Sequence, residues 1–158
     1  MAIAAGSIQA ECYLGQQLIK GEGVEKDVQK GIKMIEHVIE ELGLEEAMYI
    51  LAEIYSGGIH VERSVDKAMD LYRRAIDQGF AEACYGLGRI YRDDECLHND
   101  QAAFETFLKG AEMKDLDCMT EAIRMYREGI GTEMSEERAV FWEGRYTEQD
   151  GRIHPYEW

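Results

Sequence analysis

One pattern of residues recurs four times along the chain, and this recurrence constrains the fold more than any single motif does. The copies align on one large apolar or aromatic residue, at spacings of 37, 36 and 35 residues. These aligned residues are Leu18, Tyr55, Tyr91 and Tyr126. Eight positions before them stand the small residues Ala10, Ala47, Ala83 and Cys118. A period of this length is typical of helical hairpins that stack on one another.

The copy that runs from residue 47 to residue 79 shows how each repeat is built. Ala47, Leu51, Ala52 and Tyr55 fall on one face of a helix with 3.6 residues per turn. A glycine pair follows, and glycine adopts the positive φ angles that end helices. A second apolar stripe then comes from Ala68, Leu71, Tyr72 and Ala75. Each copy therefore predicts two helices joined by a tight turn.

The second helix of every copy begins with a residue that can cap it. Their side-chain oxygens can accept hydrogen bonds from the free N–H groups of a first helical turn. The four capping residues are Asp27, Ser64, Asn99 and Ser135. The third turn has exchanged its glycines for the run from Asp93 to Cys96, so we expect it to be irregular. The pattern predicts helices at about 7–20, 27–42, 45–57, 64–78, 80–93, 99–113, 115–128 and 135–147.

Composition limits the classes of partner. The chain has 158 residues, 46% of them hydrophobic and one of them proline, which predicts a single mostly helical domain over residues 1–158. Seventeen basic residues stand against 32 acidic ones, and the formal net charge of -15 disfavours nucleic acid and anionic membranes. No apolar run is long enough to span a bilayer. Since the N-terminus also lacks the pattern of an export signal, we expect a cytoplasmic protein.

Metal and catalytic sites find little support in the sequence. The acidic turn from Asp93 to His98 has metal-binding residue types, but it lacks the glycine-punctuated spacing of a calcium loop. His37, His60 and His154 lie in different repeats with no nucleophile or carboxylate at a fixed offset, and the paired glycines belong to turns of the repeat. The sequence therefore predicts no metal, no cofactor and no catalytic residue.

Four segments carry a resemblance to a known family. Leu14–Asp27, Lys67–Ala75, Ala103–Lys109 and Tyr126–Gly131 resemble the Sel-one-like repeat family, a branch of the tetratricopeptide-repeat superfamily. The resemblance covers roughly residues 7–147, and it departs from the family pattern at Leu18, at the third turn and at Ile123. It implies a scaffold or adaptor that holds a peptide or protein and has no catalysis of its own.

Some relatives in this family join the two helices of a repeat by a disulfide. Here the second helices contain no cysteine. Three thiols fall near the starts of first helices and one falls in a turn, at Cys12, Cys84, Cys118 and Cys96. We therefore expect free thiols in a reducing compartment.

The expected fold follows from the need to cover apolar faces. Each helix pair leaves a face that only a neighbouring pair can cover, so the pairs should stack. We expect an all-α, right-handed αα superhelix of four helix-turn-helix repeats, with the first helices on its concave wall. The repeats are expected at about 7–43, 44–79, 80–114 and 115–147, followed by a tail at 148–158.

The concave wall can be predicted from the positions that packing leaves over. These positions form a second stripe on each first helix: Gln9, Cys12, Gln16 and Ile19; Glu46, Tyr49, Glu53 and Ser56; Glu82, Tyr85, Arg89 and Arg92; Asp117, Thr120, Arg124 and Arg127. We expect a peptide or protein to bind chiefly through eight of them: Tyr49, Glu53, Tyr85, Arg89, Arg92, Thr120, Arg124 and Arg127.

Two interpretations of the arginines remain open. The pair Arg89 and Arg92 recurs one repeat later, and guanidinium groups recognise carboxylates bidentately, which favours an acidic partner. Alternatively, Arg89 pairs with Glu53, and Asp93 and Glu128 neutralise the others, leaving a solvated face.

The alternative function is a structural subunit that assembles through its exposed repeat ends and its tail, although we expect a monomer. The tail contains Ile153, Tyr156 and Trp158. These side chains can fold back over the fourth repeat as a cap or dock in the groove of another copy, and the local cap loses no association entropy.

Overall fold

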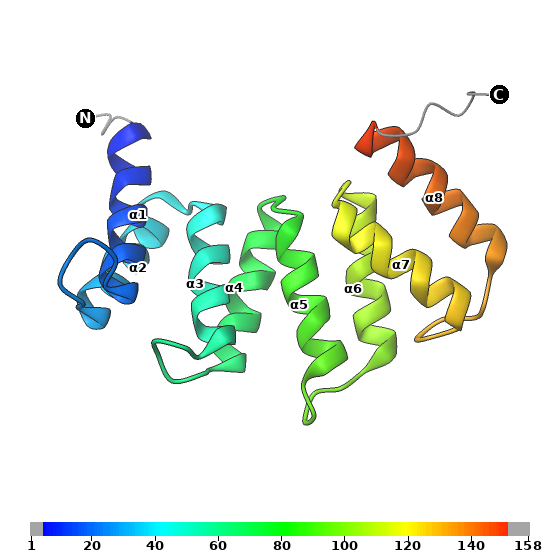
Figure 1. The fold of residues 1–158 in the computed structure, drawn as a ribbon, viewed down its shortest axis with the longest axis horizontal. Coiled ribbons are helices and arrows are strands. Elements are labelled where there is room, and N and C mark those ends of the chain that lie inside the picture. Colours follow the sequence, from blue (N-terminus) through cyan, green and yellow to red (C-terminus); the bar gives the residue numbers. More distant parts are fainter. Residues whose placement is uncertain (1–4, 152–158) are drawn as a thin grey trace. The chain divides into compact units, whose positions relative to one another are not determined.

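The computed structural model describes residues 5–151 as a succession of helices (Figure 1). No strand occurs within that range. The eight helices are α1 (Ala5–Lys20), α2 (Val28–Leu42), α3 (Glu45–Gly57), α4 (Val65–Asp77), α5 (Glu82–Asp93), α6 (Asp100–Glu112), α7 (Leu116–Glu128) and α8 (Glu136–Asp150). The all-α class of helix-turn-helix repeats predicted from the sequence is confirmed.

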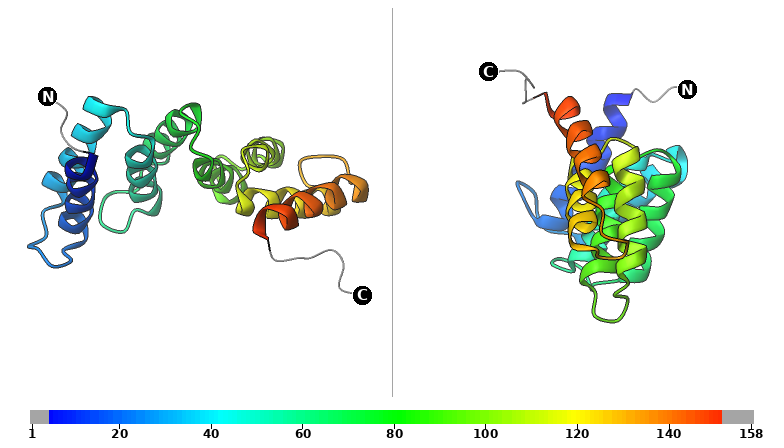
Figure 2. Two further views of the ribbon diagram at one scale, coloured as in Figure 1. Left: turned by 90° about the horizontal axis from the view of Figure 1, so that it is seen from above. Right: turned by 90° about the vertical axis from the view of Figure 1, so that its right-hand side faces the viewer.

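Consecutive helices pack as hairpins, and both figures show the partners of each hairpin side by side (Figures 1 and 2). The contacts divide the chain into two compact units, Met1–Gln78 and Gly79–Trp158. The first unit holds the hairpins α1–α2 and α3–α4, and the second holds α5–α6 and α7–α8. Within the second unit α7 packs against α6 and also contacts α5.

The predicted caps are present. Asp27, Ser64, Asn99 and Ser135 each accept a hydrogen bond from the backbone N–H three residues later. The third turn is irregular, as expected, because α5 ends in an extended residue, Asp94, instead of a left-handed glycine. The Asp94 carboxylate accepts hydrogen bonds from two backbone N–H groups of the turn, at 3.0 and 3.1 Å.

Two of the hairpins depend on a close approach between a glycine and a large side chain. A Cβ atom placed on Gly88 of α5 would lie 2.5 Å from the ring of Phe107 on α6. In the first hairpin, a Cβ atom on Gly15 would lie 2.9 Å from Ile35. Phe107 and Ile35 are fully buried, so these contacts form the core of their hairpins. The fourth hairpin has Ile123 and Glu143 at the corresponding positions.

In the first hairpin, two residues expected on the concave wall lie elsewhere. Cys12 and Ile19 were expected on the concave wall, but both are buried. For Ile19 the reason is the contact between Gly15 and Gly31, where an added Cβ on Gly31 would lie 2.5 Å from the Gly15 carbonyl oxygen. Because the two backbones approach so closely, α1 turns its Ile19 side chain onto α2.

Two expected packing residues of the first helix are exposed instead. Ala10 and Leu14 are exposed, although the aligned positions in the later repeats are buried. At the other end, α8 continues to Asp150, three residues beyond its expected end. The aromatic residues of the tail, and with them the cap hypothesis, lie outside the described residues. Among residues 5–151 we find no helix with the length and apolar content needed to cross a bilayer.

Substitution of Gly110 tests the close packing of the second unit. A Cβ at this position of α6 would lie 2.3 Å from the Cys118 sulfur and 2.7 Å from the Cys84 Cβ. We expect Gly110→Ala to lower the free energy of unfolding by about 1–3 kcal/mol, measured by urea denaturation. Gly144→Ala is the matched control, because its Cβ meets nothing within 4 Å, and it should stabilise α8 by about 0.5–1 kcal/mol. Equal effects of both substitutions would contradict this description of the core.

Candidate functional site

A groove between α7 and α8 holds three of the predicted binding residues. Its volume is about 720 Å³, and the predicted residues in its wall are Thr120, Arg124 and Arg127. The remaining lining residues are Ile123, Glu128, Glu143, Tyr146 and Thr147. All eight belong to the second unit. The groove combines apolar surface with guanidinium and carboxylate groups, a composition suited to a peptide or protein segment.

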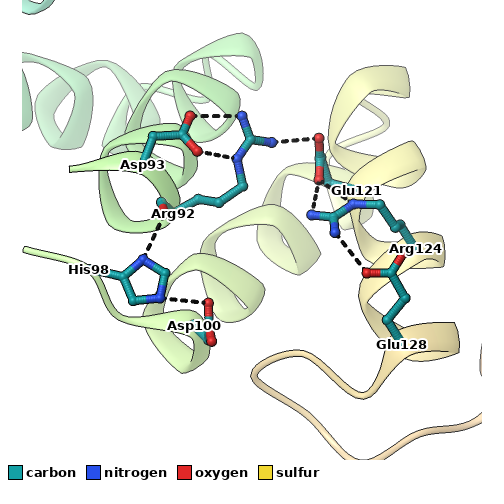
Figure 3. Close-up of polar contacts among 7 residues, drawn as sticks. All are labelled: Arg92, Asp93, His98, Asp100, Glu121, Arg124 and Glu128. Atoms are coloured by element: carbon teal, nitrogen blue, oxygen red, sulfur yellow. Dashed lines mark hydrogen bonds and ion pairs between the residues drawn. The ribbon is translucent and has the colours of Figure 1, made fainter. Parts of the chain in front are cut away.

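A network of ion pairs joins α5 to α7 beside this groove (Figure 3). Glu121 on α7 accepts hydrogen bonds from Arg92 on α5, at 2.6 Å, and from Arg124 one turn further along α7, at 2.9 Å. Arg92 also donates two bonds to Asp93, at 2.7 and 2.8 Å, and Arg124 donates one to Glu128, at 3.0 Å. Glu121 is therefore the carboxylate that links the two first helices of the unit.

Exposure separates the members of this network. The side chain of Glu121 is 15% exposed and that of Arg92 is 26% exposed, whereas the Glu128 side chain is 51% exposed. The hydrogen bonds from Arg92 lower the pKa of Asp93, and those to Glu121 raise the pKa of Arg124. A pair held away from water resists exchange more than a solvated pair does. Arg92 and Glu121 thus form the fixed part of the network, and Glu128 forms its exchangeable edge.

Arg127 lies further along α7 and pairs with two carboxylates of the last hairpin. It lies 3.1 Å from Glu136 and 2.8 Å from Glu143, and these partners raise its pKa. The Glu136 side chain is 67% exposed. Arg127 is consequently neutralised by solvated partners, which is the weakest kind of ion pair.

The other predicted residues lie in both units. In the second unit, the guanidinium of Arg89 lies 5.4 Å from the centre of the Tyr85 ring, which itself contacts Phe107. In the first unit, Tyr49 contacts the ring of Tyr72, and the Tyr72 hydroxyl donates a hydrogen bond to Glu53. Six of the eight predicted residues therefore belong to the second unit, three of them in the wall of the groove, and Tyr49 and Glu53 belong to the first.

The local pairing predicted by the second interpretation is largely what the second unit shows. Asp93 neutralises Arg92 and Glu128 neutralises Arg124, as that interpretation expected. Sequence reasoning missed Glu121, although its position three residues before Arg124 on the same helix was a usable signal. Arg92, Arg124 and Arg127 thus form a balanced array of charges instead of a bare positive patch.

The third turn is tied to this network. The ring nitrogen Nδ1 of His98 donates to the backbone carbonyl of Arg92 at 2.7 Å, and Nε2 lies 3.2 Å from Asp100 (Figure 3). No cluster of three or more potential metal ligands exists in the described part of the chain. These contacts fix the turn against α5 and α6.

All four thiols are free, as predicted. Cys12, Cys84 and Cys118 are buried and Cys96 is exposed. Burial raises the pKa of Cys12 and of Cys84 to about 11, and it also raises the pKa of Cys118. Because the thiolate is the reactive form, the buried thiols act as small apolar residues of the core.

Comparison with known proteins matches most of the chain to one family of repeats. The family model "Sel1 repeat" matches residues 8–36, 45–80, 81–115 and 122–142.

Two solved structures are similar over 90% of this chain. One is a Sel1 repeat protein from Oxalobacter formigenes, with a TM-score of 0.72 and 24% identity. The other is a protective antigen of uropathogenic Escherichia coli strains that displays an SLR fold, with a TM-score of 0.77 and 23% identity. At this identity the likeness shows the fold alone. The chain spans 41% of the first protein and 30% of the second.

A curated relative is similar over a shorter stretch. The chitin synthase regulatory factor 4 of Schizosaccharomyces pombe is 32% identical over 91 residues, which are 57% of this chain. The chain spans 14% of that protein.

Removing the Glu121 carboxylate, which Arg92 and Arg124 share, should destabilise the second unit. We expect Glu121→Gln to lower the free energy of unfolding by about 1–3 kcal/mol, because charged hydrogen bonds to Arg92 and Arg124 are lost in a half-buried place. Thermal and urea denaturation measure the change. Glu136→Gln serves as the control and should leave stability unchanged, since Arg127 keeps Glu143. The assignment is wrong if the control destabilises the chain as much as Glu121→Gln does.

The buried thiols predict a loss of stability in alkali. The folded pKa of Cys12 and Cys84 is about 11, whereas the pKa of a thiol in the unfolded chain is about 8.5. The folded chain therefore holds more protons between these values, and the free energy of unfolding should fall as the pH rises through that window. Urea denaturation from about pH 8 to about pH 11 measures the slope. In the Cys12→Ala, Cys84→Ala variant the slope should be smaller, and an unchanged slope would contradict the assignment.

Proposed function

The chain belongs to the Sel1 repeat family, whose members generally mediate protein–protein interactions, and from that premise we propose that it is a protein-binding adaptor without catalysis of its own. Its partner is a peptide or protein segment that carries acidic residues. The observation that carries this proposal is the α7–α8 groove, because Thr120, Arg124 and Arg127, which the sequence predicts as binding residues, line one cavity.

The exposed pairs explain how an acidic segment can bind to arginines that already have partners. Glu128 and Glu136 are more than half exposed, and solvated ion pairs contribute little free energy. A carboxylate of the partner can therefore take the place of Glu128 on Arg124, or of Glu136 on Arg127, at small cost. The favourable free energy of binding comes from apolar contact of the partner with Ile123 and the ring of Tyr146 in the same groove.

The remaining candidates have supporting roles in this proposal. Arg92 is held by Asp93 and Glu121 and positions α7 against α5. Tyr85 and Arg89 extend the same stripe along α5, and Tyr49 and Glu53 lie on the stripe of α3 in the first unit. Free thiols fit a reducing compartment such as the cytoplasm.

Selection from a library tests the preference for acidic partners. Random peptides of about 12 residues are displayed, selected on the wild-type chain and counter-selected on the Arg124→Glu, Arg127→Glu variant. We expect the enriched peptides to carry an excess of Asp and Glu, because the two guanidinium groups favour carboxylates. Calorimetry on a selected peptide should show binding weakened by about tenfold or more in the double variant.

The control keeps the change of charge but moves it out of the groove. Arg145 lies on α8 beside the Phe141 ring and does not line the groove, so Arg145→Glu should leave the affinity of the selected peptide within about twofold. Circular dichroism confirms that each variant remains helical. Selected peptides without acidic enrichment, or peptides that bind the double variant as tightly as the wild type, would refute the proposal.

A further inference from the structure

The first unit contains a groove of its own, lined by α2, α3 and α4, with a volume of about 540 Å³. The two second helices α2 and α4 come from consecutive hairpins, and α3 lies between them in the chain. The groove is therefore a surface between two hairpins, and we call it the α2–α4 groove. Its buried lining is apolar and consists of Ile39, Leu51, Tyr55 and Leu71.

The polar wall of the α2–α4 groove is rich in carboxylates. Glu36 and Glu40 come from α2, and Asp66 and Asp70 come from α4. Each pair is separated by four residues, so its two side chains lie one helical turn apart on the same face, with Cβ atoms about 5–6 Å from each other. Each of the two second helices thus contributes a short row of negative charge to the groove.

Three of these carboxylates have no cation to neutralise them. Within residues 5–151, Glu36, Glu40 and Asp66 make no ion pair. Asp70 lies 3.9 Å from Arg74, but its side chain is 70% exposed, and a long, solvated pair contributes little free energy. In the α7–α8 groove, by contrast, guanidinium and carboxylate groups pair with each other. The α2–α4 groove therefore has an excess of negative charge.

The other cation in the wall, Lys67, contacts an aromatic ring. Its Nζ lies 4.9 Å from the centre of the Tyr55 ring. The same contact recurs in the fourth repeat, where the guanidinium of Arg138 lies 5.7 Å from the centre of the Tyr126 ring. The contact thus belongs to the repeat and does not neutralise the carboxylates. It also shows that this lining accommodates a cation beside apolar surface.

The carboxylates on α2 are not a general property of the repeat. In the repeat alignment, Glu36 corresponds to Arg73, Leu108 and Gly144. A basic, an apolar and a small residue therefore occupy this position in the other three hairpins. Packing of the hairpins does not require a carboxylate here, so stacking alone does not explain the acidic wall.

The spread of the carboxylates favours an organic cation as the ligand. No three potential metal ligands come together in the part of the chain that the structure describes. Separate carboxylates suit separate ammonium or guanidinium groups, and the apolar lining suits the aliphatic stems of Lys and Arg side chains. The net charge of -15 also attracts a basic partner over long range.

We propose that the α2–α4 groove binds a basic peptide or protein segment. The segment presents two Lys or Arg side chains, about one helical turn apart, to the carboxylates of α2 and α4, and its apolar atoms cover the buried lining. The inference goes beyond the proposed function, because it gives the first unit a partner of its own. One chain would then hold an acidic segment in one groove and a basic segment in the other.

Selection from a peptide library tests this proposal. Random peptides of about 12 residues are selected on the wild-type chain and counter-selected on the Glu40→Lys, Asp66→Lys variant, in which both changed side chains are exposed. We expect the enriched peptides to carry an excess of Lys and Arg. Calorimetry on a selected peptide should show binding weakened by about tenfold or more in the variant. Enriched peptides without basic residues, or equal binding to the variant, would overturn the proposal.

A matched control makes the same change of charge outside the groove. Glu22 and Glu25 lie in the turn between α1 and α2 and do not line the groove, so Glu22→Lys, Glu25→Lys should leave the affinity of the selected peptide within about threefold. Circular dichroism confirms that each variant remains helical. If the control loses as much affinity as the Glu40→Lys, Asp66→Lys variant, the peptide responds only to overall charge and the proposal is wrong.

Sedimentation of the chain without peptide tests a second copy as the occupant. We expect a monomer at the concentrations used for calorimetry, because copies with a net charge of -15 repel one another. A dimer that is lost in the Glu40→Lys, Asp66→Lys variant would show that a second copy fills the groove, and it would overturn the proposal of a basic segment.

The two grooves can be tested independently, because they lie in different units. The Arg124→Glu, Arg127→Glu variant should bind the selected basic peptide within about threefold of the wild-type affinity. In the same way, the Glu40→Lys, Asp66→Lys variant should bind the selected acidic peptide within about threefold. Loss of one activity leaves the other measurable, so failure of either proposal can be told from failure of the other.

Discussion

The close approach of paired helices is the constraint on which the rest of this structure depends. Gly88 against Phe107, Gly15 against Ile35 and Gly110 against Cys118 allow contacts that an added methyl group would prevent. Where two helix backbones come this near, large side chains on the opposite helix are fully buried. The orientation of the two helices is then fixed by their packing. The proposed groove is lined by residues of α7 and α8 that these contacts leave accessible.

Local chemistry made much of this fold predictable. The capping residues Asp27, Ser64, Asn99 and Ser135 act through bonds to N–H groups three residues away, so the sequence alone fixes where those helices begin. The burial of Ile19 was not predictable, because it depends on how far α1 rotates once Gly15 meets Gly31. The exposure of Leu14 depends on which neighbours a helix has, a property that a single repeat does not encode.

Three of the eight residues that line the candidate groove could be predicted from the sequence, whereas its electrostatics could not. The helical period places Thr120, Arg124 and Arg127 on one stripe, and the structure finds them in one groove. The bridge that Glu121 makes to Arg92 joins two repeats, so it needs the packing of α7 on α5 before it can be recognised. Counting arginines along a helix therefore overstates a positive surface when the neighbouring helix supplies the carboxylates.

The third turn reverses the chain without glycine. No residue between Asp93 and Asn99 has a positive φ, and the turn is held by the Asp94 carboxylate and by the His98 ring. The turn at Gly58 requires a positive φ angle, whereas this turn depends on the bonds that Asp94 accepts from the Cys96 and Leu97 N–H groups and on the His98 ring. The exposed Cys96 thiol is thus a natural place to attach a reporter group, because Asp94 binds the backbone N–H of Cys96 and the labelled turn would keep that bond.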